Sequence, residues 1–198
     1  RAYDQIRVSV AHARYNVKYF PTEGLLGGDG PFHECLESVA LGYYLPHMQV
    51  QWPCDSIEAN KATLTAIRDI KGPVITLQER GPKPVVTKEK TPYQFGIANI
   101  IRYTGKQPNF VDAFETRLST KWSGAEADIV IVAVGSQVAE AMRAAVILKP
   151  DGAVIRVADF QKALPVSGLS DVSSQASFYQ RMQPYPPPGL RWRTATGI

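Results

Sequence analysis

The chain runs Val17-Lys18-Tyr19-Phe20-Pro21 and then places four glycines within seven residues, from Gly24 to Gly30. The first run is β-branched and aromatic, which is typical of a strand, and Pro21 stops it. Neither a helix interior nor a strand interior tolerates that density of glycine, so the segment Gly27–His33 predicts a loop. Helical periodicity returns over residues 33–44. A strand, a glycine loop and a helix are therefore expected in succession.

The same alternation continues on both sides of this stretch. Residues 2–15 carry apolar positions at helical spacing and predict a helix. Residues 48–52 alternate like a strand, and a helix capped by Asp55 or Ser56 follows. Residues 74–77 form a further strand. Strands that alternate with helices of this length predict an α/β fold, a parallel-sheet domain with flanking helices.

The composition changes after residue 85, which suggests a division into four parts. We expect a partial first domain over residues 1–85 and a linker with a surface excursion over 86–126. A partial second α/β domain is expected over 127–160. The serine- and proline-rich residues 161–198 predict an irregular or disordered tail, because they offer little apolar periodicity for a core.

The second half of the chain also contains predicted strands. Residues 95–103 are a candidate strand, whereas residues 104–127 are polar and only weakly periodic. Residues 128–134 are apolar throughout after the first position and predict a buried strand. A helix to about residue 148 follows, and residues 153–157 predict the next parallel strand.

Bulk composition excludes several classes of function. No apolar run reaches the roughly 18 residues that a membrane-spanning helix needs, so no membrane is expected. The net charge of +4 is mild and scattered, which argues against nucleic acid and suits an anionic metabolite. The two cysteines, Cys35 and Cys54, show neither metal-ligand spacing nor a disulfide framework, and a reducing cytoplasm is expected. Cys54 is expected to be a packing residue.

Three side chains are candidates for one ligand site. In open parallel sheets ligands bind beyond the carboxyl ends of the strands, where the glycine loop and Arg80 both fall. Asp29 can accept hydrogen bonds from vicinal hydroxyls, although a loop aspartate often bonds its own turn. His33 opens a helix where an anion can bind, and Arg80 suits a bidentate phosphate contact. The alternatives are a surface helix-cap histidine and a solvated arginine.

Several separate motifs, in compatible order and spacing, resemble the transketolase family over roughly residues 1–160. The resemblance implies the later part of the family's pyrimidine-binding domain and the start of its C-terminal domain. It also implies thiamine diphosphate and Mg²⁺ as cofactors, and two-carbon ketol transfer between ketose and aldose phosphates. The motifs are Arg1–Arg7, Gly27–His33, Pro53–Asp55 with Glu58, Gly72–Val74 leading to Arg80, and Val132–Ser136 with Val138–Ala141.

Roles for the three candidates follow from the resemblance. Asp29 would bond substrate hydroxyls near the reacting carbons, and His33 with Arg80 would hold the terminal phosphate. No catalytic residue is expected in the chain, since the family's activating glutamate precedes the equivalent of Arg1. The resemblance implies that a diphosphate-domain partner chain or an N-terminal region supplies this glutamate. It also implies that the intact enzyme is a homo-oligomer. The 198 residues alone are expected to bind the cofactor weakly and to be inactive, as a fragment, a split subunit or a truncated reading frame.

Other interpretations stay open. Gly28 stands where the family has glutamate and Pro21 where many members have histidine. The synthases of 1-deoxyxylulose 5-phosphate usually place arginine at the position of Thr22, which favours a transketolase. Such a synthase, a 2-oxoacid dehydrogenase β-type subunit and a catalytically dead interaction module remain alternatives. A magnesium site formed by Gly28–Gly30 and Asn60 is disfavoured, because a helix and a strand are predicted between them.

Overall fold

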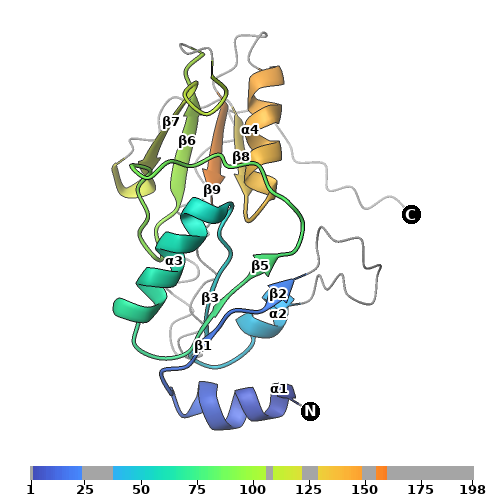
Figure 1. Ribbon diagram of the computed structural model, residues 1–198, viewed down its shortest axis with the longest axis vertical. Coiled ribbons are helices and arrows are strands. Elements are labelled where there is room, and N and C mark those ends of the chain that lie inside the picture. The colour runs from blue at the N-terminus through green and yellow to red at the C-terminus, as the bar shows by residue number, and fades with distance from the viewer. Residues whose placement is uncertain (1, 24–37, 106–108, 122–128, 149–154, 160–198) are drawn as a thin grey trace, which may run out of the picture. The chain divides into compact units, whose positions relative to one another are not determined.

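The computed structural model describes residues 2–23, 38–105, 109–121, 129–148 and 155–159. The chain divides into two units, residues 1–166 and 167–198, and every described residue lies in the first (Figure 1). The predicted tail over 161–198 and the glycine loop thus lie outside the described residues. No helix within the described ranges is long and apolar enough to cross a membrane.

The chain begins with a helix, as its periodicity predicts, but the helix changes type after one turn. The α-helix α1 (Ala2–Gln5) runs directly into the π-helix η1 (Ile6–His12), and the Tyr15 N–H still donates to the Val10 carbonyl at 3.0 Å. Such i→i+5 spacing is typical of π-helical turns. Ala11 is completely buried in a core cluster against which Ile6 packs, so this helix covers the first sheet's core.

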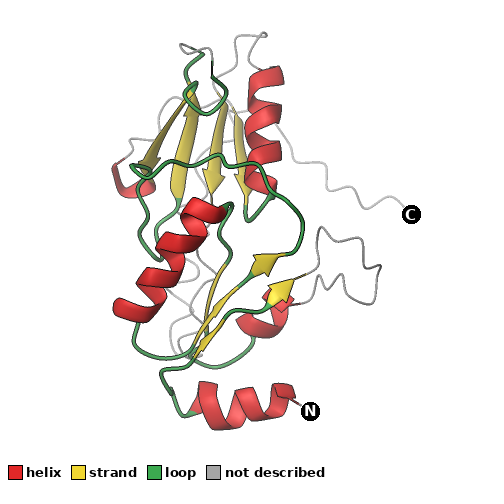
Figure 2. Cartoon of the chain, in the orientation of Figure 1, coloured by secondary structure: helices red, strands yellow, loops and turns green. Residues whose placement is uncertain are grey.

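The first sheet is parallel throughout, as predicted (Figure 2). Its order is β1 (Lys18–Tyr19), β4 (Val74–Thr76) and β3 (Gln49–Gln51). A second parallel pair, β2 (Thr22–Glu23) with β5 (Gln78–Glu79), follows directly after β1 and β4 along the chain. The two segments that contain these strands therefore run side by side as far as residues 23 and 79.

Two further helices complete the first domain. The short helix α2 (Ser38–Tyr43) precedes β3, and α3 (Ser56–Arg68) connects β3 to β4. Ala62 and Ala66 are fully buried on α3, and small side chains of this kind let a helix approach a sheet closely. Parallel strands joined by a helix make the α/β fold that the sequence predicts.

The second sheet differs from its prediction. Its order is β7 (Phe114–Leu118), β6 (Asn99–Tyr103), β9 (Ile155–Asp159) and β8 (Ile129–Ala133). The parallel pairing of β8 with β9 is as expected, whereas β6 is antiparallel to both β7 and β9. Residues 104–127 were expected to be a surface excursion, which is wrong for β7. The sheet takes strands from both sides of residue 127, and the exact domain boundaries stay a prediction.

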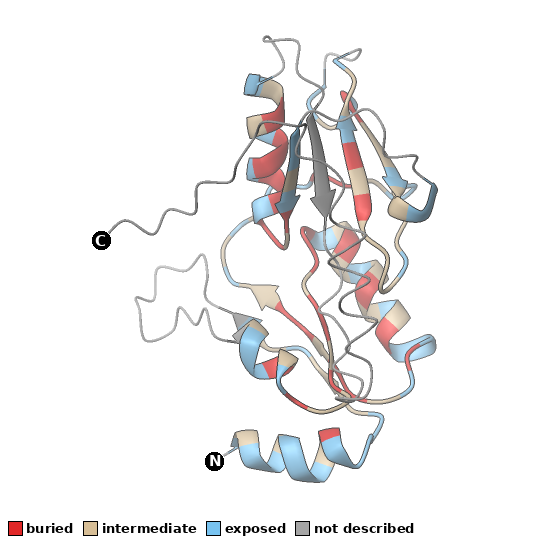
Figure 3. Ribbon diagram, turned by 180° about the vertical axis from the view of Figure 1, so that it is seen from behind, coloured by how far each residue is buried: buried red, intermediate tan, exposed pale blue. Residues whose placement is uncertain are grey.

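The helix α4 (Gln137–Leu148) packs on one face of this sheet with a stripe of buried side chains (Figure 3). Val138 and Met142 belong to that stripe and are at most 1% exposed. Strand β8, expected to be buried, is instead an edge strand whose Val130 and Val132 are 52% and 56% exposed. A continuous apolar run is typical of a central, buried strand. The sequence pattern alone does not distinguish such a strand from an edge strand like β8. A short 3-10 turn, η2 (Ser119–Lys121), follows β7.

Candidate functional site

The carboxyl end of the β2–β5 pair is where the predicted ligand site would begin. Glu23 pairs with Glu79, so the chain leaves this edge at Gly24 on one strand and at Arg80 on the other. The loop predicted at Gly27–His33 follows Glu23 along the chain, and Arg80 is exposed at a bend. Arg80 therefore lies at the edge where the chain leaves β2 toward the predicted loop.

The three predicted site residues differ in what the structure says of them. Arg80 is described and lies at the predicted edge. Asp29 and His33 lie outside the described residues, and their roles stay predictions. Asn60, the partner in the disfavoured magnesium site, is exposed on α3.

Next to Arg80, Glu79 forms a buried polar contact that sequence reasoning missed. Its side chain is only 1% exposed, and its Oε1 accepts the Ser136 N–H at 3.2 Å. Its Oε2 lies 3.4 Å from the Lys83 ammonium, an ion pair without hydrogen-bond geometry. Ser136 immediately precedes α4, so the carboxylate sits at the positive end of that helix dipole. A glutamate close behind the apolar strand predicted at residues 74–77 is the signal that could have indicated this contact.

The turn before α4 approaches Glu79 so closely that only glycine fits at residue 135. A Cβ on Gly135 would lie 2.7 Å from Trp52 Nε1 and 2.8 Å from Glu79 Oε1, and the residue has φ +59°. A serine that follows a glycine before a helix is commonly an ordinary N-cap, and Trp52 is a side chain expected in the core or in an interface. Among the described residues, neither the Ser136 hydroxyl nor the Trp52 N–H finds a hydrogen-bond partner. The cap role of the Ser136 side chain is therefore wrong.

The Pro53–Asp55 motif has a structural role. Asp55 is the N-cap of α3, as predicted, and its Oδ1 accepts the Glu58 N–H at 2.9 Å. Glu58 in turn accepts the Cys54 N–H at 2.7 Å, a reciprocal arrangement similar to a capping box. Cys54 is 2% exposed within a hydrophobic cluster, which confirms that it is a packing residue. The motif thus builds the helix start rather than a reactive site.

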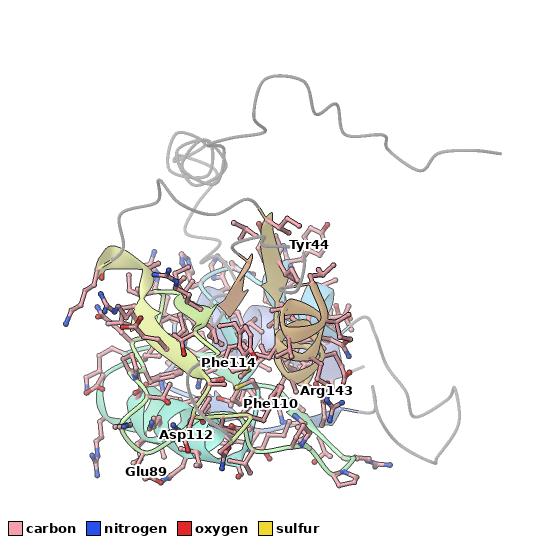
Figure 4. All side chains as sticks on the ribbon, turned by 90° about the horizontal axis from the view of Figure 1, so that it is seen from above. Tyr44, Glu89, Phe110, Asp112, Phe114 and Arg143 are labelled. Carbon is pink, nitrogen blue, oxygen red and sulfur yellow. The ribbon has the colours of Figure 1, made fainter. Side chains whose placement is uncertain are left out.

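The described residues also line an open pocket of about 610 Å³ between the linker and the β6–β7 hairpin. Lys88 and Asp112 form an ion pair on its wall, and Phe114 packs beside Phe110 with ring centroids 5.3 Å apart (Figure 4). Arg80, the predicted site residue that the structure describes, does not line this pocket. It is therefore a separate feature from the edge at Arg80.

The family resemblance implies thiamine diphosphate and magnesium, and the described residues show how far the chain fits them. No group of three or more histidine, cysteine, aspartate or glutamate side chains that could hold a metal occurs among them. The carboxylates of Glu58 and Glu79 are both buried, but each accepts a backbone N–H and neither lines the pocket. Among the described residues, no cluster of this kind is assembled for a metal ion.

Comparison with known proteins agrees with the fold. Residues 1–83 match the family model of the transketolase pyrimidine-binding domain. A putative transketolase C-terminal section from Methanocaldococcus jannaschii is 29% identical over 168 residues, which is 84% of this chain and 46% of the relative. A 1-deoxy-D-xylulose-5-phosphate synthase from a Synechococcus strain is 29% identical over 170 residues, 84% of this chain and 23% of that enzyme.

Solved structures give the same result. A split-gene transketolase, determined as an inactive beta4 tetramer, superposes with a TM-score of 0.62 at 27% identity over 82% of this chain and 45% of that one. A transketolase variant from Pichia stipitis gives a TM-score of 0.58 at 25% identity over 86% of this chain and 22% of that one. The chain is therefore similar to the transketolase family over most of its length, and members of that family depend on thiamine diphosphate. It spans less than half the length of each of these relatives.

Proposed function

We propose that this chain contributes sugar-phosphate binding to a thiamine-diphosphate-dependent ketol transfer, and that Arg80 holds the terminal phosphate. The pairing of Glu23 with Glu79 supports the proposal, because Arg80 follows Glu79 at the edge where the other strand leads into the predicted glycine loop. An exposed guanidinium at a strand's carboxyl end can form two parallel hydrogen bonds to a phosphate. Asp29 and His33 are proposed to complete the site from the loop side.

The proposal divides the chemistry between this chain and residues outside it. These 198 residues bind and orient the phosphorylated sugar, while the cofactor, magnesium and the activating glutamate come from a diphosphate-domain partner or an additional segment. Assayed by itself, the chain is proposed to show no ketol transfer. Measurable turnover of D-xylulose 5-phosphate by the purified chain would contradict this division.

Calorimetric titration with D-xylulose 5-phosphate and with D-xylulose tests the role of Arg80. Arg80→Ala is expected to weaken binding of the phosphorylated sugar about 10- to 100-fold, since a charged hydrogen bond contributes roughly 1.5–3 kcal/mol. Binding of the unphosphorylated sugar should not change. Arg102→Ala, an exposed arginine on β6, is the matched control. Equal losses for both sugars, or none, would remove Arg80 from the phosphate site.

A 1-deoxyxylulose-5-phosphate synthase is the second candidate, because several of the matched relatives bear that name. Both reactions use a phosphorylated sugar, so Arg80 serves either. The two-carbon donor separates them: a synthase takes pyruvate, which loses carbon dioxide, whereas a transketolase takes a ketose phosphate. Consumption of pyruvate, measured with the chain assembled with its diphosphate-domain partner, would favour the synthase.

A further inference from the structure

We propose that Glu79 is a positioning residue for Arg80: its buried carboxylate ties the end of β5 to the turn before α4. The inference rests on the proposed role of Arg80 in phosphate binding. Glu79 and Arg80 are consecutive, so a restraint on the Glu79 side chain restricts the backbone from which the guanidinium projects. Without such a restraint, the exposed arginine would lose more conformational freedom on binding.

The strand itself supplies little restraint. β5 has only two residues, and its one partner strand, β2, also has two. A two-residue parallel pair is a weak anchor, because short pairings need packing against other elements for stability. The long-range contact of Glu79 with Ser136, 57 residues away, provides that packing at the last residue of the strand.

The surroundings hold the Glu79 carboxylate from several sides. Ser136 N–H donates to one oxygen, and Lys83 lies 3.4 Å from the other. Gly135 brings its backbone so near that even a methyl group would collide with Glu79 Oε1 at 2.8 Å. The carboxylate therefore has little room to move, and its position is determined by the turn before α4.

Stability alone does not explain this arrangement. Glu79 Oε2, Trp52 Nε1 and Ser136 Oγ are all buried without a hydrogen-bond partner among the described residues. Such atoms each cost free energy, and replacing an entire buried ion pair with apolar side chains often leaves stability unchanged or raises it. A polar cluster that is unfavourable for stability, one residue from a proposed ligand contact, is better explained by positioning.

Two variants of the full 198-residue chain separate positioning from a structural role. Glu79→Leu keeps the volume but removes the acceptor, whereas Glu79→Gln keeps an oxygen for the Ser136 N–H. With D-xylulose 5-phosphate as the probe, Glu79→Leu is expected to raise Kd about 5- to 10-fold, and Glu79→Gln less than about 2-fold. The Kd for D-xylulose should stay unchanged in both, because a general loss of structure would affect both sugars.

A second measurement does not need a ligand. The ¹⁵N order parameter of the Arg80 backbone amide is expected near about 0.85 in the unmodified chain and below about 0.6 in Glu79→Leu. If Glu79 acts through Arg80, the double variant Glu79→Leu/Arg80→Ala binds the phosphorylated sugar no more weakly than Arg80→Ala alone. Unchanged order and unchanged Kd in Glu79→Leu would overturn the inference.

The two proposals fail in different ways. If Arg80→Ala has no effect on the phosphorylated sugar, the proposed phosphate contact is wrong, whatever Glu79 does to the order parameter. If Arg80→Ala weakens binding while Glu79→Leu alters neither affinity nor order, only the positioning role is wrong. Additive losses in the double variant would also reject positioning, because they would show that Glu79 acts independently of Arg80.

Discussion

Asp55 holds Thr87 through both of its carboxylate oxygens. Oδ2 accepts the Thr87 N–H at 2.7 Å, and Oδ1 accepts the Thr87 hydroxyl at 2.8 Å. Oδ2 also accepts the Val86 N–H at 2.8 Å, while Oδ1 caps α3 through Glu58. One buried side chain thus starts a helix and attaches the linker to it.

Asp55→Ala should therefore cost more than the loss of a helix cap. A lost cap costs about 1 kcal/mol, and leaving the N–H groups of Val86 and Thr87 unpaired in a buried site adds about 1–3 kcal/mol. We expect a loss of roughly 3 kcal/mol in the free energy of unfolding, measured by urea denaturation. Ser56→Ala, an exposed neighbour, should change it by less than about 0.5 kcal/mol. Similar small losses for both variants would show that the linker contact contributes nothing.

Gly135 and Gly72 form a matched pair of glycines with positive φ. A Cβ added to Gly72, at φ +108°, would meet open space, whereas one added to Gly135, at φ +59°, would lie 2.7 Å from Trp52 Nε1. Backbone strain alone would make Gly72→Ala the worse substitution, because alanine tolerates φ near +60° better than +108°. We expect the reverse, with Gly135→Ala costing about 2–3 kcal/mol because the collision adds to the strain. Thermal unfolding of both variants decides which effect dominates.

The first domain could be predicted from sequence because its signals are local. The run at residues 17–20, the alternation at 48–52 and the aspartate at 55 each determine structure within a few residues. The connection from β3 through α3 to β4 then follows, since parallel strands need a crossover. The placement of Arg80 on the ligand edge followed from chain order alone.

The features that the sequence did not predict depend on contacts between residues that are far apart in the sequence. β7 alternates Phe114, Thr116 and Leu118 with charged residues, a weak pattern that becomes a strand only when it pairs with β6. The exposure of β8 depends on its edge position, which strand order decides. The contact of Glu79 with Ser136 spans 57 residues and leaves no periodic trace in the sequence.

The surroundings of His47 lead us to expect that the stability of the folded chain depends on pH. It has φ +59°, and its pKa is lowered below the usual 6.5 by partial burial and by the nearby positive charges of Arg14 and His12. Between the lowered pKa and 6.5 the unfolded chain binds more protons, so stability rises with pH across that window. The loss of stability caused by protonating His47 is absent above about pH 6.5, and it is complete once the pH falls below the folded-state pKa.

His47→Asn should remove that loss of stability, and asparagine also tolerates a positive φ well. The variant is expected to match or exceed the original chain at about pH 7.5 and to gain stability relative to it as the pH falls toward about 5. His47→Gly removes the same charge, so its free energy of unfolding should change with pH in the same way as that of His47→Asn. The two variants should differ only by an amount that does not depend on pH. Chemical denaturation at several pH values measures this, and parallel curves for His47 and both variants would exclude a role for its protonation.

Strand β8 offers a test of which face of the second sheet is buried. Ile131 packs against the core cluster that includes Met142, whereas its neighbour Val132 is 56% exposed. Ile131→Ala is expected to cost about 2 kcal/mol, toward the low end for a core isoleucine because the side chain is only partly buried. Val132→Ala should cost less than about 1 kcal/mol, mainly through lower strand propensity. Comparable losses at both positions would mean that Val132 is covered in solution, because an exposed valine contributes too little buried area to produce them.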